Sequence, residues 1–203
     1  MKIICIGRNY AEHAKEMKSQ LPSEPIFFLK PDTSYLKPGN PFFIPSFSNN
    51  IHYECEIVVK ICKVGKNISE KFAPKYYNEI GLGLDFTARD LQEKCKANGT
   101  PWEIAKSFEH SSPISKEFIN KSTINLNELI FSLHKNDSIV QRGNTKDMIF
   151  NINQIISYVS QFMTLKTGDL IYTGTPAGVG KVDIGDNLVG YIGEKQMFEV
   201  RIK

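Results

Sequence analysis

Apolar residues along this chain occur mostly in short runs bounded by glycine, proline and asparagine, a pattern that predicts short β-strands. The run at 54–62 is rich in β-branched residues, which favour strands. Asn136-Asp137 separates two such runs and indicates a tight hairpin turn. In chain order, strands are expected at residues 2–6, 26–30, 42–44, 54–62, 79–84, 128–135, 138–142, 170–173, 187–192 and 197–202.

Three segments have a helical pattern instead. The apolar residues of 151–163 recur every three or four positions, which predicts an amphipathic helix. Shorter helices are expected at 10–17 and 87–96. The segment 18–25 is polar and contains two prolines, so we expect it to be a mobile loop.

Strands therefore outnumber helices, and the glycine-rich turns are not followed by regularly alternating helices. This order favours an α+β, β-rich mixed fold over a doubly wound parallel sheet. A length of 203 residues is typical of one domain, so residues 1–203 are expected to form a single unit.

Composition and charge exclude several classes of partner. The net charge is only +3, and no basic block is interleaved with aromatic residues, so a nucleic-acid partner is not expected. No apolar run approaches the roughly 20 residues needed to cross a membrane. The four cysteines form no C-x-x-C pair, which favours reduced thiols in a cytoplasmic protein over a zinc site or a disulfide framework.

Two glutamates open the β-branched run. Side chains alternate between the faces of a strand, so Glu54 and Glu56 share one face while Cys55 points away. Adjacent carboxylates repel each other unless a positive charge lies between them, and oxygen ligands suit Mg²⁺ or Mn²⁺. An isolated pair of this kind is nevertheless more often part of a solvent-exposed strand edge.

A second cluster of polar residues follows the apolar run that ends at Leu84. If a helix begins there, Asp85, Arg89 and Gln92 lie on one face and present a carboxylate, a guanidinium and an amide. Such a face suits a metal ligand and two contacts to an anionic substrate. The alternative is a helix-capping aspartate with a surface Asp–Arg pair, which is common.

Three further residues could take part in catalysis, although their sequence patterns are weak evidence for such a role. His13 and Glu16 meet on one helical face, where a carboxylate orients an imidazole and raises its basicity, as a general base requires. By spacing alone, an ordinary pair on an exposed helix is favoured. Lys106 lies among apolar residues, either with its ammonium group reaching water or with a functional role.

The glycine-rich segment 173–181 suggests a phosphate-binding loop, but the pattern fails. Thr175 stands where that motif requires its first glycine, and Val182 stands where it requires Ser or Thr. The loop could instead lend backbone N–H groups and the Thr175 hydroxyl to a carboxylate.

In combination these segments resemble the fumarylacetoacetate hydrolase family, and the resemblance extends in order along nearly the whole chain. It is closest to the short, single-domain branch of acylpyruvases and oxaloacetate decarboxylases. The matching segments are Gly7-Arg8-Asn9-Tyr10 with His13 and Glu16, Phe28-Leu29-Lys30-Pro31, His52-Tyr53-Glu54-Cys55-Glu56, Leu84-Asp85-Phe86-Thr87-Ala88-Arg89-Asp90, Ala105-Lys106-Ser107-Phe108 and Thr173-Gly174-Thr175-Pro176-Ala177-Gly178-Val179-Gly180.

The resemblance implies a mixed β-sandwich roll with a few peripheral helices, usually a homodimer. It also implies roles for individual residues, including a mobile lid formed by 9–25. The implied metal ligands are Glu54, Glu56 and Asp85 for Mg²⁺ or Mn²⁺, the implied catalytic residues are His13, Glu16 and Lys106, and the implied substrate contacts are Arg89, Gln92 and Thr175.

By the same resemblance, the expected activity is hydrolysis of a C–C bond in an acylpyruvate-type 1,3-dioxo acid, through an enolate that the cation stabilises. Oxaloacetate decarboxylation and isomerisation or tautomerisation of a 2-hydroxydienoate pass through a similar enolate and stay open. A non-catalytic binding protein of the same fold and a nucleotide-binding protein are the alternatives from other functional classes.

Overall fold

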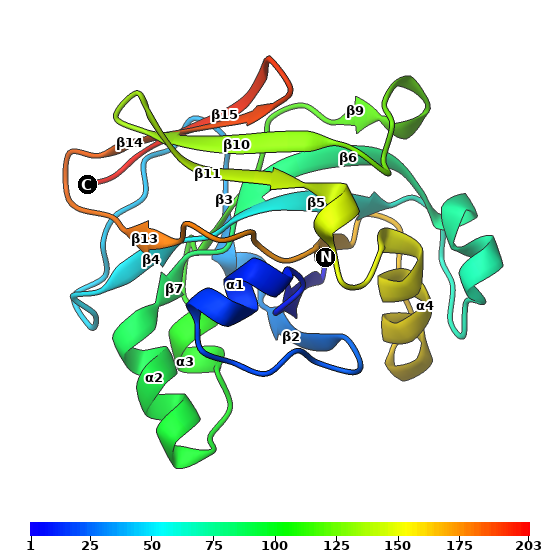
Figure 1. Ribbon diagram of the computed structural model, residues 1–203, viewed down its shortest axis with the longest axis horizontal. Coiled ribbons are helices and arrows are strands. Elements are labelled where there is room, and N and C mark those ends of the chain that lie inside the picture. The colour runs from blue at the N-terminus through cyan, green and yellow to red at the C-terminus, as the bar shows by residue number, and fades with distance from the viewer.

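The computed structural model describes residues 1–203 and consists mainly of strands arranged in four sheets (Figure 1). The six-stranded sheet is mixed, because β1 and β12 run parallel and its other neighbouring strands are antiparallel. Its order is β2 (Ile26–Lys30), β1 (Ile3–Gly7), β12 (Leu170–Tyr172), β5 (Cys55–Ile61), β6 (Tyr77–Leu84) and β9 (Ile119–Asn120).

A four-stranded antiparallel sheet packs over β5 and β6 of the first sheet. Its order is β11 (Ser138–Asn144), β10 (Ile130–Lys135), β14 (Asn187–Ile192) and β15 (Lys195–Arg201). Two smaller sheets complete the structure: β13 (Gly180–Lys181), β4 (Ile51–Tyr53) and β7 (Thr87–Ala88) in one, and β3 (Tyr35–Leu36) with β8 (Ser112–Pro113) in the other. The arrangement is the strand-rich α+β class that the sequence predicts.

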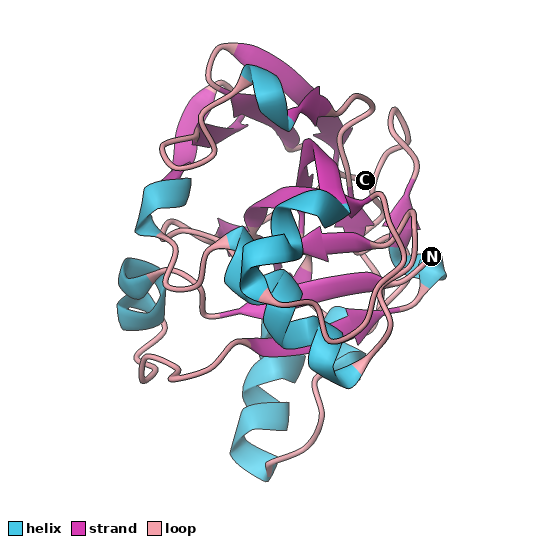
Figure 2. Cartoon of the chain, turned by 90° about the vertical axis from the view of Figure 1, so that its right-hand side faces the viewer, coloured by secondary structure: helices cyan, strands magenta, loops and turns pink.

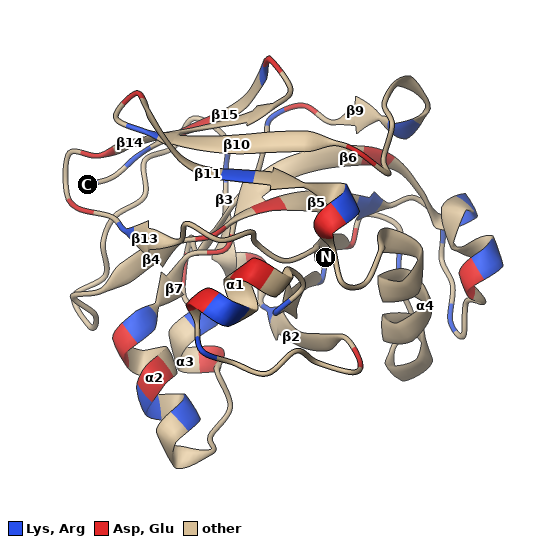
Figure 3. Ribbon diagram, in the orientation of Figure 1, with Lys and Arg blue, Asp and Glu red and all other residues tan.

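Four α-helices lie mostly around the outside of the strands (Figure 2). They are α1 (Ala11–Glu16), α2 (Arg89–Asn98), α3 (Glu103–Lys106) and α4 (Ile152–Phe162). Charged residues of both signs occur along α2, whereas α4 carries none (Figure 3). None of the helices has the length and hydrophobicity that crossing a bilayer requires.

The two faces of the six-stranded sheet support two separate hydrophobic clusters, which follows from the two-residue period of a strand. Along β5, Cys55 and Ile57 face the main core between the large sheets. Val58 belongs to a smaller cluster on the other face, with Ile3 and Tyr172. Glu56 has the same parity as Val58, so its carboxylate lies on the side away from the main core.

Most predicted elements are confirmed, and the errors concern residues that pair with segments distant in the sequence. The hairpin between β10 and β11 turns at Asn136 and Asp137, both with positive φ. The strand expected at 42–44 is wrong, because only Phe42 forms a bridge, to Ile202. The helix expected from Thr87 begins two residues later, since Thr87 pairs with His52 in a sheet.

The N-terminus of α4 offers a test of local stability. The Asn151 side chain accepts a hydrogen bond from the backbone of Gln154, whose own side chain accepts one from the Asn151 backbone. Replacing such a cap removes a partner from the first helical turn. We expect Asn151→Ala to lower the free energy of unfolding by about 1 kcal/mol in urea denaturation. The exposed Asn127→Ala serves as the control, with an expected change below about 0.5 kcal/mol.

Candidate metal centre and active site

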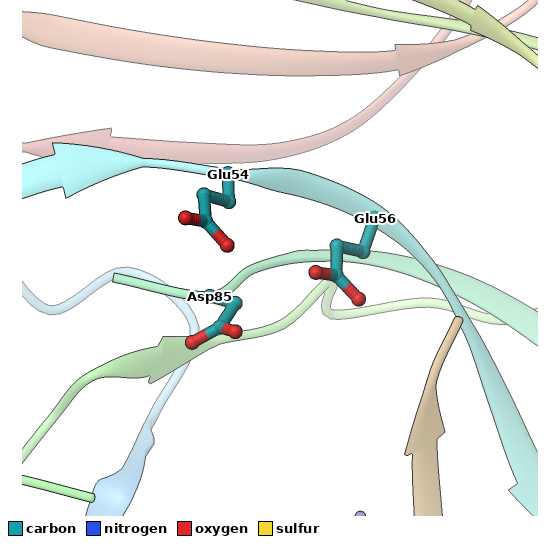
Figure 4. A group of neighbouring side chains, drawn as sticks. All are labelled: Glu54, Glu56 and Asp85. Atoms are coloured by element: carbon teal, nitrogen blue, oxygen red, sulfur yellow. The ribbon is translucent and has the colours of Figure 1, made fainter. Parts of the chain in front are cut away.

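Three buried carboxylates converge at one point beneath α1. Glu54 lies between β4 and β5, Glu56 lies on β5, and Asp85 follows the end of β6. Figure 4 shows Glu54 and Glu56 extending from the same side of the chain toward Asp85. One oxygen from each group lies within 4.8 Å of the others. The shared face expected for Glu54 and Glu56 is therefore present, and the alternative of an exposed strand edge is wrong.

Three buried cations contact two of these carboxylates. The Lys106 ammonium lies between Glu54 and Asp85, 2.7 Å from an oxygen of each. The Arg89 guanidinium donates to the second Glu54 oxygen at 2.6 Å, and Lys30 Nζ lies 2.6 Å from the second Asp85 oxygen. Because an unpaired buried charge is very costly, these contacts hold the ionised forms of both acids inside the protein.

The pKa values follow this distribution of charge. Burial acts to raise the pKa of the Glu54 carboxyl, but Lys106 and Arg89 hold it well below its usual value. Burial likewise opposes the charge on Lys106, yet Asp85 and Glu54 raise its pKa to about 12. Glu56 behaves oppositely: burial, Asp85 and Glu54 all raise the pKa of its carboxyl.

Lys30 is a member of this network to which the sequence analysis assigned no role. Its ammonium is fully buried and also donates to the carbonyl and hydroxyl oxygens of Ser111, each at 3.0 Å. In the sequence it only ends an apolar run before Pro31. A buried lysine at the end of an edge strand must have an anionic partner, but that partner, Asp85, is distant in the sequence.

Glu56 is the carboxylate without a contacting cation. Its side chain accepts a hydrogen bond from the backbone N–H of Gly174 at 2.7 Å, and no lysine or arginine pairs with it. When Glu56 is ionised, its negative charge is therefore not offset by a contacting lysine or arginine. Hard oxygen donors in this arrangement suit Mg²⁺ or Mn²⁺. The donor set fits a divalent cation held by Glu54, Glu56 and Asp85.

Helix α1 places His13 and Glu16 over the carboxylates. His13 is buried, and its Nδ1 lies 3.0 Å from one Glu16 oxygen, as the helical spacing predicts. The other Glu16 oxygen accepts the N–H of Gly178 at 3.1 Å. Glu16 thereby links α1 to the glycine-rich loop and orients the imidazole. The mobility expected for 9–25 stays a prediction.

The glycine-rich loop donates N–H groups to protein carboxylates, Glu56 and Glu16, rather than to a phosphate. Gly174 has φ +98°, and a Cβ there would lie 2.6 Å from Cβ of Asn9. Glycine is therefore required where the loop passes the turn after β1. This close approach brings the segment that leads into α1 next to the loop whose Gly174 N–H binds Glu56.

The predicted substrate contacts line the same cavity but are engaged with protein groups. Arg89 donates to Gln92 at 2.6 Å as well as to Glu54. The alternative of a helix-capping Asp85 in a surface pair with Arg89 is wrong, because Asp85 precedes β7 and Arg89 pairs with Glu54. The Thr175 hydroxyl donates to the carbonyl of Cys55 and accepts from Gln141.

The cavity over the carboxylates is small, about 30 Å³, with α1 above it. Arg8, Phe28, Lys96 and Trp102 also line it, and the sequence analysis gave none of them a role. A larger hollow of about 600 Å³ lies elsewhere, between 36–41 and β15, and holds no comparable cluster. The cluster of ionisable residues therefore identifies the site better than the volume of the cavity does.

Comparison with known proteins identifies the family to which the chain belongs. The family model described as fumarylacetoacetate (FAA) hydrolase C-terminal matches residues 2–203. The chain is 47% identical over 187 residues to the mitochondrial oxaloacetate tautomerase FAHD1 of Bos taurus, covering 92% of this chain and 84% of that protein. It is also 47% identical over 186 residues to the mitochondrial oxaloacetate decarboxylase of Dictyostelium discoideum, covering 91% and 85%.

A solved structure is similar throughout. The crystal structure of fumarylpyruvate hydrolase from Pseudomonas aeruginosa, in complex with Mn²⁺ and pyruvate, superposes with a TM-score of 0.93 at 36% identity. The match covers 100% of this chain and 89% of that one. The family match over residues 2–203 and these similarities in sequence and fold show that the chain belongs to the fumarylacetoacetate hydrolase family of enzymes.

Proposed function

We propose that this protein is a Mg²⁺- or Mn²⁺-dependent hydrolase that cleaves a C–C bond in acylpyruvate-type 1,3-dioxo acids. The observation that carries the proposal is the meeting of Glu54, Glu56 and Asp85 beneath the His13–Glu16 pair. A binding protein would need neither an oriented imidazole nor a third carboxylate without a cationic partner. The P. aeruginosa relative crystallised with Mn²⁺ and pyruvate supports this substrate class.

Glu54, Glu56 and Asp85 would hold the cation. When bound, such an ion polarises a 2-oxo group and stabilises an enolate as a Lewis acid. The Lys106 ammonium already lies between Glu54 and Asp85, which indicates that this point favours positive charge. Arg89 and Gln92, which are hydrogen-bonded to each other and line the cavity, would contact the substrate carboxylate.

His13 would act as the general base. With its Nδ1 paired to Glu16, its Nε2 is available to accept a proton from water. The hydroxide adds to the distal carbonyl, the C–C bond breaks, and its electron pair moves to the pyruvate fragment as an enolate. Lys106 offers a fixed positive charge to that developing anion, and protonation of its carbon gives pyruvate beside the released acid.

A second candidate is enol–keto conversion or decarboxylation of oxaloacetate. It is favoured by the relatives from B. taurus and D. discoideum, each 47% identical to this chain. Decarboxylation gives the same pyruvate enolate with loss of CO₂ and needs no attacking water. Tautomerisation needs only proton transfer between carbon and oxygen. These reactions use the carboxylates and Lys106 but differ in what they require of His13.

Substrate entry requires movement of the covering segment. The cavity of about 30 Å³ is far below the roughly 300 Å³ at which ligand pockets usually begin. We therefore propose that 9–25 opens and closes as a lid, with the contact between Glu16 and Gly178 as its latch. A homodimer and a cytoplasmic location stay predictions of the sequence analysis.

The cation site is tested most cleanly through Glu56. Glu56→Gln keeps an acceptor for the Gly174 N–H and removes a buried charge, so the metal-free variant should melt no lower than the wild type. Mg²⁺ in about hundredfold excess over its Kd should raise the wild-type melting temperature by roughly 5–10 °C. The variant should lose this shift, whereas Glu79→Gln, at a partly exposed carboxylate outside the cavity, should keep it. A full Mg²⁺ shift in Glu56→Gln would contradict the assignment.

The substrate class is tested with a panel of oxo-acids. We expect acetylpyruvate turnover with Mg²⁺ or Mn²⁺, complete loss on chelation, and loss in Glu54→Gln and Asp85→Asn. Because both substitutions break buried ion pairs, circular dichroism must show that each variant is folded. Turnover that is unchanged after chelation would exclude the cation-dependent mechanism.

His13 separates the two candidate reactions. His13→Ala should slow acetylpyruvate hydrolysis by about 10²- to 10⁴-fold, the usual contribution of a general base. Oxaloacetate decarboxylation by the same variant should be affected far less, because no water is activated. His134→Ala, which changes a histidine on β10 outside the cavity, is the control. Full hydrolysis by His13→Ala would rule out the catalytic pair.

A further inference from the structure

Two cations at the rim of the cavity have no anionic partner. Arg8 and Lys96 both line the space above the carboxylates, yet neither head group makes an ion pair or a hydrogen bond. The deeper cations Lys30, Arg89 and Lys106 are all paired. The positive charges of Arg8 and Lys96 are therefore not neutralised by Glu54, Glu56 or Asp85.

Arg8 is held at the rim in a strained backbone conformation. Its φ is +58°, in the left-handed region that non-glycine residues seldom adopt. The next residue fixes this backbone conformation. The side-chain amide of Asn9 donates to the carbonyls of Phe150 and Thr173, and its oxygen accepts a hydrogen bond from the N–H of Phe150. Strain that the surroundings enforce at the edge of a cavity is typical of residues whose side chain has a functional direction.

Lys96 reaches the same corner from α2. Its Nζ lies 5.7 Å from the ring centroid of Trp102, which packs 6.1 Å from the ring of Phe28. Trp102 also lies against Gly7, beside Arg8. Partial burial, Arg89 and Arg8 all lower the pKa of Lys96, in keeping with cations crowded on one side of the cavity.

The balance of charge indicates what this corner binds. With Glu56 ionised, as a metal ligand must be, the three carboxylates carry three negative charges, and Lys30, Arg89 and Lys106 carry three positive ones. A divalent cation and the two rim residues then leave an excess of positive charge. One substrate carboxylate beside the 2-oxo group neutralises only part of it. A second carboxylate at the far end of the substrate would find Arg8 and Lys96 unoccupied.

We propose that Arg8 and Lys96 form a second anion subsite, which binds the distal carboxylate of a dicarboxylic 2-oxo acid. The proposal rests on the function proposed above and narrows its substrates to dianions. Guanidinium and ammonium groups at a partly desolvated rim make charge-assisted hydrogen bonds that an uncharged acyl end cannot form. Dicarboxylic acids of the oxaloacetate type are thereby preferred over simple acylpyruvates.

The test compares ligands that differ in the distal group and that lack the 1,3-dioxo arrangement. Calorimetric titration with Mg²⁺ present would measure Kd for pyruvate, 2-oxoglutarate and 2-oxoadipate. We expect at least one dicarboxylate to bind the wild type about tenfold or more tightly than pyruvate, the effect of one good charged contact. In Arg8→Gly and Lys96→Met this ratio should fall nearly to one, while the Kd of pyruvate changes by less than about twofold.

Two controls keep the result specific. Lys94→Met makes the same change on an exposed position of α2 outside the cavity and should keep the wild-type ratio. Arg8→Gly relieves the positive φ, so its melting temperature should not fall even though dicarboxylate affinity does. A purely structural role for Lys96, such as interaction with the end of α2, would lower stability and leave the ratio unchanged.

The outcomes separate this subsite from the function beneath it. If pyruvate binds with Mg²⁺ and the ratio is the same in the wild type and both rim variants, the subsite is wrong and the proposed function stands. If pyruvate does not bind with Mg²⁺ at all, the proposed function fails and the subsite fails with it.

Discussion

The site depends on one constraint: six charges are buried together and must balance. Glu54 and Asp85 are each contacted by two cations, and Lys106 is shared between them. Removing any one partner would leave an uncompensated charge in a region of low polarity, so the network is cooperative. Glu56 is the exception within it. A carboxylate that lacks a cation of its own is where the protein is best prepared to accept an external one.

The fold supplies this arrangement through backbone geometry more than through side-chain packing. The two-residue period of β5 directs Glu56 away from the main core, and the end of β6 brings Asp85 opposite. The glycine-rich loop then passes so close to Asn9 that only glycine fits at position 174. The contact between Gly174 and Asn9 therefore helps to place three features of the site: the hydrogen bond to Glu56, the start of α1 and the position of Arg8.

Local rules predicted the elements well where neighbouring residues decide the outcome. The hairpin at Asn136-Asp137, α4 and the facing of Glu54 and Glu56 follow from turn chemistry and periodicity. The same local rules failed where a residue pairs with a segment that is distant in the sequence. Thr87 joins a sheet because His52 is available to pair with it, and residues 42–44 form no strand because their only bridge is the one from Phe42 to Ile202. Neither partner is recognisable from the segment itself.

The amino-acid sequence by itself determined the strand-rich class, the residues of the acidic cluster, the His13–Glu16 spacing and, through the order of its motifs, the family. These features depend on local periodicity or on residue identity in sequence. The tertiary structure decided which cation contacts which acid, assigned Lys30 to the site, and left Arg8 and Lys96 without an anionic partner. Charge balance is a property of groups within a few ångströms of one another, and sequence separation carries no information about that distance.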